Sequence, residues 1–137
     1  MRLLLVALAL VALAACSTTP DDDDGPDSDY APASDAALLE QVSGLPGVET
    51  ATVRFREGFG RTGYYATVEV GADADPLDVA DRTYAVLRQG QPNVPISLEV
   101  VQDDTIVDTT SVAGVGTPEE LEERYGPQPG DGTPPGG

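Results

Sequence analysis

The chain has 137 residues, enough for one small domain once a leader is set aside. Its 24 acidic residues outnumber 7 basic residues, all of them arginine, and the formal net charge is −17. This charge argues against nucleic-acid binding, because phosphate backbones are recognised by basic surfaces. Histidine and lysine are absent and Cys16 is the only cysteine. Imidazole bases, Schiff-base lysines, Cys/His zinc sites and internal disulfides are therefore excluded.

Residues 1–15 have the layout of a secretory signal peptide. Arg2 precedes an apolar run over residues 3–15, which is shorter than the roughly 20 residues of a membrane-spanning helix. The run ends in the letters LAAC at residues 13–16, and this segment resembles the lipobox of bacterial lipoproteins. The resemblance implies transfer of a diacylglyceryl group to the Cys16 thiol and cleavage just before Cys16. A chance cysteine after an ordinary secretory signal is the alternative.

Residues 16–33 form a predicted linker. After the cysteine their composition changes abruptly to Asp, Pro, Ser and Thr, which cannot build a core. We expect an extended acidic spacer that reaches at least roughly 20–25 Å. Two acyl chains on Cys16 would anchor the chain stably where one chain is marginal. The predicted location is the extracytoplasmic face of the cell membrane, with the membrane as a partner through this lipid.

The first predicted folded elements are a helix and a β-hairpin. The helix begins at Ser34 or Asp35, which are both good N-caps, and ends at Ser43. Two strands follow at residues 50–56 and 64–70, where apolar and polar side chains alternate. Each strand is expected to bury one face.

A second helix, two further strands and a short last helix follow. Asp75 is an N-cap and precedes a proline at the first helical position. Alternation predicts a strand at residues 96–100 and a weaker one at residues 105–110, and Thr117 with Glu120 forms a capping box for the last helix. The expected buried stripe of the second helix is Leu77, Ala80, Tyr84 and Leu87.

This order predicts an α+β fold, a small two-layer sandwich in which an antiparallel sheet of three or four strands carries helices on one face. The domain is expected to span residues 34–126, and a disordered Pro/Gly tail is expected at residues 127–137. The other sheet face should be open to water. Its polar positions are Thr50, Thr52, Arg54, Tyr65, Thr67, Glu69, Ser97 and Glu99.

Two domain families have a similar order of elements. The letters LPGV at residues 45–48 and YATVEV at residues 65–70 are similar to heavy-metal-associated domains of the ferredoxin-like type. Those domains carry a Cys-x-x-Cys pair before the first helix, which this chain lacks there, so no copper function follows. The order also resembles the BON domains of envelope proteins, which implies adhesion or lipid contact. The glycine-framed strands of that family are not evident.

The predicted hairpin holds half of the arginines outside the leader. If Val53 pairs with Val68, as the apolar pattern suggests, Arg56 lies opposite Tyr65 on the exposed face. Arginine beside aromatic rings gives a cationic surface suited to carboxylate, phosphate or carbohydrate groups. The candidate binding residues are Arg54, Arg56, Phe59, Arg61 and Tyr65.

A purely structural cluster is the alternative for these residues. In that interpretation Arg56 stacks on Tyr65, while Glu57 and Glu69 neutralise the positive charge. The cluster would then stabilise the folded domain and would bind no partner.

No catalytic residue, cofactor or metal site is predicted. We expect a membrane-anchored envelope lipoprotein with a non-catalytic domain for binding, adhesion or support of an envelope complex. Its partner would be an envelope protein or a cell-wall polymer, and not a nucleic acid. Two alternatives stay open. One is a small-ligand carrier, with a pocket between helices and sheet, that delivers to a membrane partner. The other is a carboxylate-dependent hydrolase with two carboxylates facing across a cleft.

Overall fold

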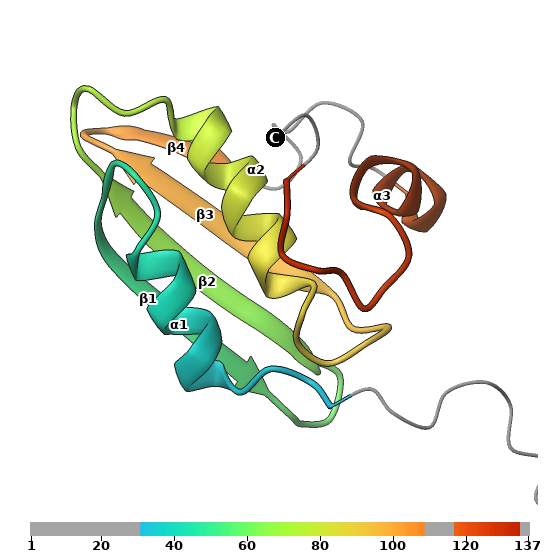
Figure 1. Cartoon of the computed structure of the whole chain (residues 1–137). Helices are drawn as coiled ribbons and strands as arrows, with labels where there is room; N and C mark the ends of the chain where they lie inside the picture. The colour runs from blue at the N-terminus through green and yellow to red at the C-terminus, as the bar shows by residue number, and fades with distance from the viewer. Residues whose placement is uncertain (1–30, 109–116, 135–137) are drawn as a thin grey trace, which may run out of the picture.

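The computed structural model describes residues 31–108 and 117–134 (Figure 1). The elements are α1 (Asp35–Ser43), β1 (Val48–Arg56), β2 (Gly63–Val70), α2 (Pro76–Leu87), β3 (Ile96–Gln102), β4 (Thr105–Asp108) and α3 (Pro118–Tyr125). The strands form one sheet in the order β1-β2-β3-β4, and α1 and α2 pack on one of its faces. The predicted α+β class and the helices on one face are confirmed. The predicted leader, Cys16, most of the linker and the last two residues of the predicted fourth strand lie outside the described residues.

The sheet is mixed, whereas the sequence pattern led to an antiparallel sheet. β1 with β2 and β3 with β4 are antiparallel, but β2 and β3 are parallel, with Tyr64 beside Ile96 and Val68 beside Val100. The chain passes from β2 to β3 through α2. A crossover of this kind brings two strands into a sheet in the same direction. The antiparallel prediction is therefore wrong at the central pairing.

The three helices predicted from the sequence begin at their predicted caps. The side chains of Ser34, Asp75 and Thr117 each accept a hydrogen bond from a backbone N–H in the first turn of α1, α2 and α3. Each such cap stabilises a helix by about 0.5–2 kcal/mol, because these N–H groups have no partner inside the helix. Next to the cap of α1, Asp35 accepts a hydrogen bond from the Phe55 backbone N–H at 2.8 Å. The start of α1 is thereby tied to the end of β1.

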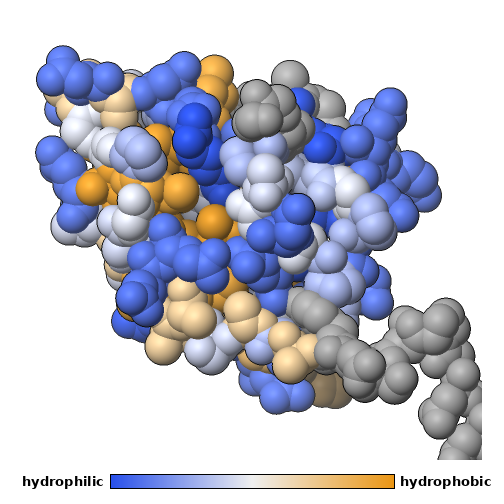
Figure 2. All heavy atoms as spheres, viewed as in Figure 1, coloured by the Kyte–Doolittle hydropathy of each residue, from blue (hydrophilic) through white to orange (hydrophobic). Residues whose placement is uncertain are grey.

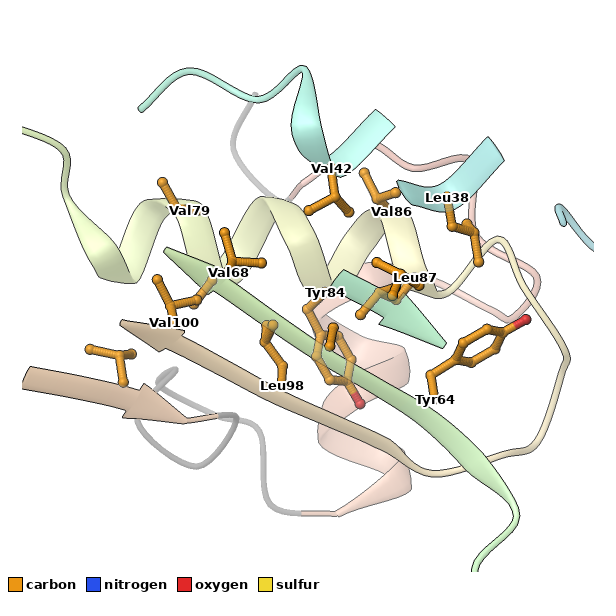
Figure 3. Close-up of a cluster of buried hydrophobic side chains, with 14 of the residues drawn as sticks. Leu38, Val42, Tyr64, Val68, Val79, Tyr84, Val86, Leu87, Leu98 and Val100 are labelled. Atoms are coloured by element: carbon orange, nitrogen blue, oxygen red, sulfur yellow. The ribbon is translucent and has the colours of Figure 1, made fainter. Parts of the chain in front are cut away.

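The core fills the space between the sheet and the two helices α1 and α2, as Figure 3 shows. Leu77, expected in the buried stripe of α2, is 47% exposed, because the face of α2 that meets the sheet begins at Val79. Seen from the helix side, the surface is mostly hydrophilic, and apolar residues show mainly between α1 and α2 (Figure 2). The core residues without exposure are Leu38, Val42, Val68, Ala80, Thr83, Leu87 and Val100.

Residues 127–134 follow a defined path over the end of α2, although the composition predicted a disordered tail. The Gly130 N–H donates to the Arg88 carbonyl at 3.2 Å, and the Gln128 side-chain amide donates to the Gln91 carbonyl at 3.1 Å. These bonds use backbone and amide groups, which composition-based reasoning does not weigh. The folded unit therefore extends beyond the predicted boundary at residue 126.

Three segments lie together at one end of the domain. The Ala33 N–H donates to the Gln89 carbonyl at 2.9 Å, just after the end of α2. The hairpin loop at residues 57–62 and the loop at residues 90–95 lie beside residues 31–34, where the described chain begins (Figure 1). We call this group of three segments the entry end.

Candidate functional site

The hairpin pairing differs by two residues from the predicted one. Arg54 lies opposite Tyr65 and Arg56 lies opposite Gly63, whereas the predicted pairing placed Arg56 opposite Tyr65. A shift of two residues leaves every side chain on the same face of the sheet. The alternation of apolar and polar residues therefore cannot distinguish the two registers, and the turn at residues 57–62 decides between them.

Three of the predicted binding residues come together on the sheet face that the helices do not cover. Arg54, Arg56 and Tyr65 line a recess of about 340 Å³, which we call the sheet-face recess. The Arg56 guanidinium carbon lies 5.2 Å from the centroid of the Tyr65 ring. The recess therefore combines positive charge with an aromatic face. It also takes lining from Thr52, Ala66, Thr67, Ser97 and Glu99.

The two arginines of the sheet-face recess form no ion pair with any residue that the structure describes. Elsewhere in the described residues, ion pairs lie within α2, between Arg82 and Asp78, and between α2 and α3. Glu69, one of the two residues expected to neutralise the cluster, accepts a hydrogen bond from the Thr50 hydroxyl at 2.6 Å instead. The stacking of Arg56 expected in the structural alternative is present, but neither Glu57 nor Glu69 forms an ion pair with the two arginines.

The other two candidate residues lie at the tip of the hairpin. Phe59 is fully exposed and Arg61 is exposed in the loop at residues 57–62, where the Arg61 N–H donates to the Gly58 carbonyl at 3.2 Å. This tip belongs to the entry end. The structure therefore divides the predicted binding residues into two groups, one in the sheet-face recess and one at the tip of the hairpin.

A larger cleft, which the sequence did not reveal, lies between α2, the start of β3 and α3. Its volume is about 540 Å³. Ile96 lines this cleft and Ser97 lines the sheet-face recess, so the two sites lie on opposite faces of the sheet at the start of β3. The remaining lining of the cleft consists of Tyr84, Arg88, Asn93, Val94, Pro95, Pro118, Leu121, Glu122, Pro127 and Gln128.

The Asp81 carboxylate of α2 binds two side chains of α3, the helix that forms one wall of the cleft. Arg124 donates to Asp81 from Nε at 3.1 Å and from Nη2 at 2.7 Å, and the Tyr125 hydroxyl donates to the same carboxylate at 2.6 Å. The Tyr125 ring lies 5.1 Å from the Tyr84 ring. Burial, reinforced by the Asp81 carboxylate, raises the pKa of Tyr125 well above its ordinary value of 10.0. Figure 1 shows α3 and the segment after it beside the end of α2.

An acidic recess of about 420 Å³ lies at the end of the domain opposite the entry end. Four carboxylates line it, from Glu49, Asp73, Asp75 and Asp78. Asp75 caps α2, and Asp78 pairs with Arg82 at 2.8 Å, so two of the four carboxylates have structural partners. Over the described ranges, the structure holds no group of three or more His, Cys, Asp or Glu side chains arranged to bind a metal ion.

Comparisons with known proteins add no assignment. No family model matches the chain, and neither the curated proteins nor the solved structures include a match to it. In the part of the chain that the structure describes, no helix has the length and apolar character needed to cross a membrane. The resemblances to lipoproteins and to BON domains therefore stay predictions.

Proposed function

We propose that the protein is a lipid-anchored envelope protein whose domain binds a partner through the sheet-face recess and catalyses no reaction. The observation that carries this proposal is the absence of ion pairs at Arg54 and Arg56 among the described residues. The chain has 24 acidic residues, so a carboxylate partner for each arginine would be easy to supply. Arginines that stay unpaired on an open face suit an external anionic or polar partner.

The chemistry of the recess supports a partner that carries carboxylate, phosphate or sugar groups. A guanidinium binds carboxylate and phosphate through paired hydrogen bonds. The Tyr65 ring and the hydroxyls of Thr52, Thr67 and Ser97 add a stacking surface and further hydrogen-bonding groups. The recess crosses three neighbouring strands of a sheet, and such an open surface suits an extended polymer or a protein better than an enclosed small molecule. We therefore expect an envelope protein or a cell-wall polymer as the partner.

The positions of the side chains favour binding over the two alternatives. A carrier was expected to hold its ligand between helices and sheet, and where α1 and α2 cover the sheet that space is filled by core side chains (Figure 3). A hydrolase needs two carboxylates facing each other, and in the sheet-face recess Glu99 is the one carboxylate among the described lining residues. In the acidic recess, two of the four carboxylates, those of Asp75 and Asp78, already have structural partners.

Pull-down from crosslinked cells tests the binding proposal. We expect the double variant Arg54→Ser/Arg56→Ser to lose partner recovery, with thermal stability unchanged because both side chains are exposed. Arg82→Ser is the matched control, because it removes an exposed arginine on the other face. Arg61→Ser separates the hairpin tip from the recess. Unchanged recovery with the double variant would contradict the proposal.

Replacement of Cys16 tests the anchor separately. Cys16→Ala should release the protein from the membrane fraction or block its maturation, because the thiol that accepts the lipid is gone. Metabolic labelling with a radioactive fatty acid should mark the natural chain and leave the variant unmarked. An unmarked natural chain would end the anchoring proposal and leave the binding proposal open.

A further inference from the structure

We propose that the cleft beside α3 binds a small organic anion, an apolar body with one carboxylate or phosphate group, and that Arg88 holds the charged group. This proposal goes beyond the function proposed above. The cleft and the sheet-face recess lie on opposite faces of the sheet and share no lining residue. Binding at one site can therefore be lost while binding at the other is kept.

Arg88 is a buried cation with an incomplete set of partners. It is 5% exposed and lies in the wall of the cleft. Its guanidinium has five N–H donors. Among the described residues, Nη2 donates to the Gly126 carbonyl at 2.8 Å, while Nε is buried and has no acceptor. A buried charge without a counter-ion is costly, and buried donors in native proteins nearly always have acceptors.

The neighbouring Arg124, in contrast to Arg88, has a carboxylate counter-ion among the described residues. Arg124 and Arg88 both lie against the Tyr125 ring, with guanidinium carbons 5.7 and 5.8 Å from its centroid. Arg124 has Asp81 as its counter-ion at 2.7 Å, whereas no described carboxylate lies within 4.0 Å of the Arg88 nitrogens. Glu122 also lines the cleft, but it is exposed and does not pair with Arg88. The counter-ion of Arg88 is thus expected from outside the described chain.

The shape of the cleft defines the rest of the ligand. Its volume of about 540 Å³ lies within the range of roughly 300–1,000 Å³ that is typical of small-molecule sites. Val94, Ile96 and Leu121 give it apolar walls, and the Asn93 and Gln128 side chains are its neutral polar groups. Apolar walls around one cation fit a ligand with an apolar body and a single anionic group.

Binding is tested with a chain that starts at residue 16 and carries Cys16→Ser, so that it stays unacylated. Hexanoate, phenylacetate and phenyl phosphate are titrated and followed by two-dimensional amide NMR, with hexanamide and phenylacetamide as neutral counterparts. We expect at least one of the three anions to bind saturably and to shift the amides of Val94 and Leu121. Hexanamide and phenylacetamide should bind at least about tenfold more weakly than the corresponding carboxylates, because they lack the charge-assisted bonds to the guanidinium. The carboxylate and phosphate probes distinguish the two kinds of headgroup.

Two variants link the binding to Arg88 and to the cleft. Arg88→Gln should weaken binding at least about tenfold, whereas Arg82→Gln, which lies in α2 and outside the cleft, should leave it unchanged. Because Arg88→Gln also disturbs the bond to Gly126, Leu121→Trp provides a second test that fills the cleft and keeps the arginine. The proposal is overturned if no anion binds saturably, if anions and amides bind equally, or if the shifts fall on the hairpin. The variant Arg54→Ser/Arg56→Ser should bind the anions normally, which separates this site from the sheet-face recess.

Discussion

Removal of the Asp81 carboxylate should detach α3 from α2 while the core stays folded. This carboxylate accepts three hydrogen bonds, two from Arg124 and one from Tyr125. The Asp81 and Arg124 side chains are 16% and 31% exposed, so solvent screens the pair only in part. Hydrogen bonds to charged groups contribute about 1.5–3 kcal/mol, whereas exposed ion pairs contribute about 0.2–1 kcal/mol. We expect Asp81→Ala to lower the free energy of local opening of α3 by about 2 kcal/mol.

Amide hydrogen exchange of a peptide that covers α3 measures this local opening. A loss of about 2 kcal/mol corresponds to exchange roughly 30-fold faster at the same pH. The control is Asp78→Ala, which removes the ion pair with Arg82. In this pair the Arg82 side chain is 41% exposed and the Asp78 side chain is 53% exposed. This helical pair should contribute about 0.5 kcal/mol or less, and its removal should leave α3 unaffected. Exchange of α3 within about twofold of the natural chain after Asp81→Ala would refute the proposed role of this carboxylate.

Three further outcomes are expected from urea unfolding followed by circular dichroism. The Thr83 hydroxyl is buried without a hydrogen-bond partner among the described residues, so Thr83→Val should raise the free energy of unfolding by about 1 kcal/mol; a loss would contradict this. A Cβ on Gly90 would collide with the buried Tyr64 ring, so Gly90→Ala should cost about 1–3 kcal/mol, while Gly58→Ala, with open space around it, should change little. Folding raises the pKa of Tyr125 above 10.0, so the unfolded chain loses that proton first, and stability should fall as pH rises above 10.0. Tyr125→Phe should make this alkaline loss smaller, and an unchanged pH profile would argue against it.

The parts of the fold that depend on local chemistry could be predicted from the sequence. Ser34, Asp75 and Thr117 cap helices through hydrogen bonds to residues two or three positions away, so a single sequence contains the whole interaction. The two faces of the hairpin strands are likewise fixed by alternation. Both kinds of signal act within one element and need no knowledge of what packs on it.

The pairing of strands depends on segments that are distant in sequence, and there the prediction was wrong. The direction of β3 was nevertheless signalled, because a complete helix at residues 76–87 separates it from β2. The hairpin register was not signalled, since both registers bury the same side chains. Register matters for the site, because it decides whether Arg54 or Arg56 lies opposite Tyr65.

The cleft could not be predicted because its key residue is buried by remote parts of the chain. Arg88 follows α2 and precedes Gly90, a position where an arginine is ordinarily solvated. It is covered because α3 and residues 127–134 fold back over the end of α2, where Gly126 and Gly130 bond to it from about 40 positions away. The Pro/Gly composition of that segment gave no sign of this packing.

Both proposed sites extend to the entry end, and this position matters for an anchored protein. Arg56 at the last position of β1, and the cleft residues Asn93 and Val94, lie at the end where residues 31–34 join the domain. If residues 16–33 form the spacer that the sequence predicts, with a reach of roughly 20–25 Å or more, a lipid at Cys16 would keep that end toward the bilayer. The negative charge of such a spacer would oppose close contact with anionic headgroups, so the space between domain and bilayer would stay open to other molecules. We therefore expect the partner and the anionic ligand among molecules at the membrane surface, and not among those confined to the outermost layer of the envelope.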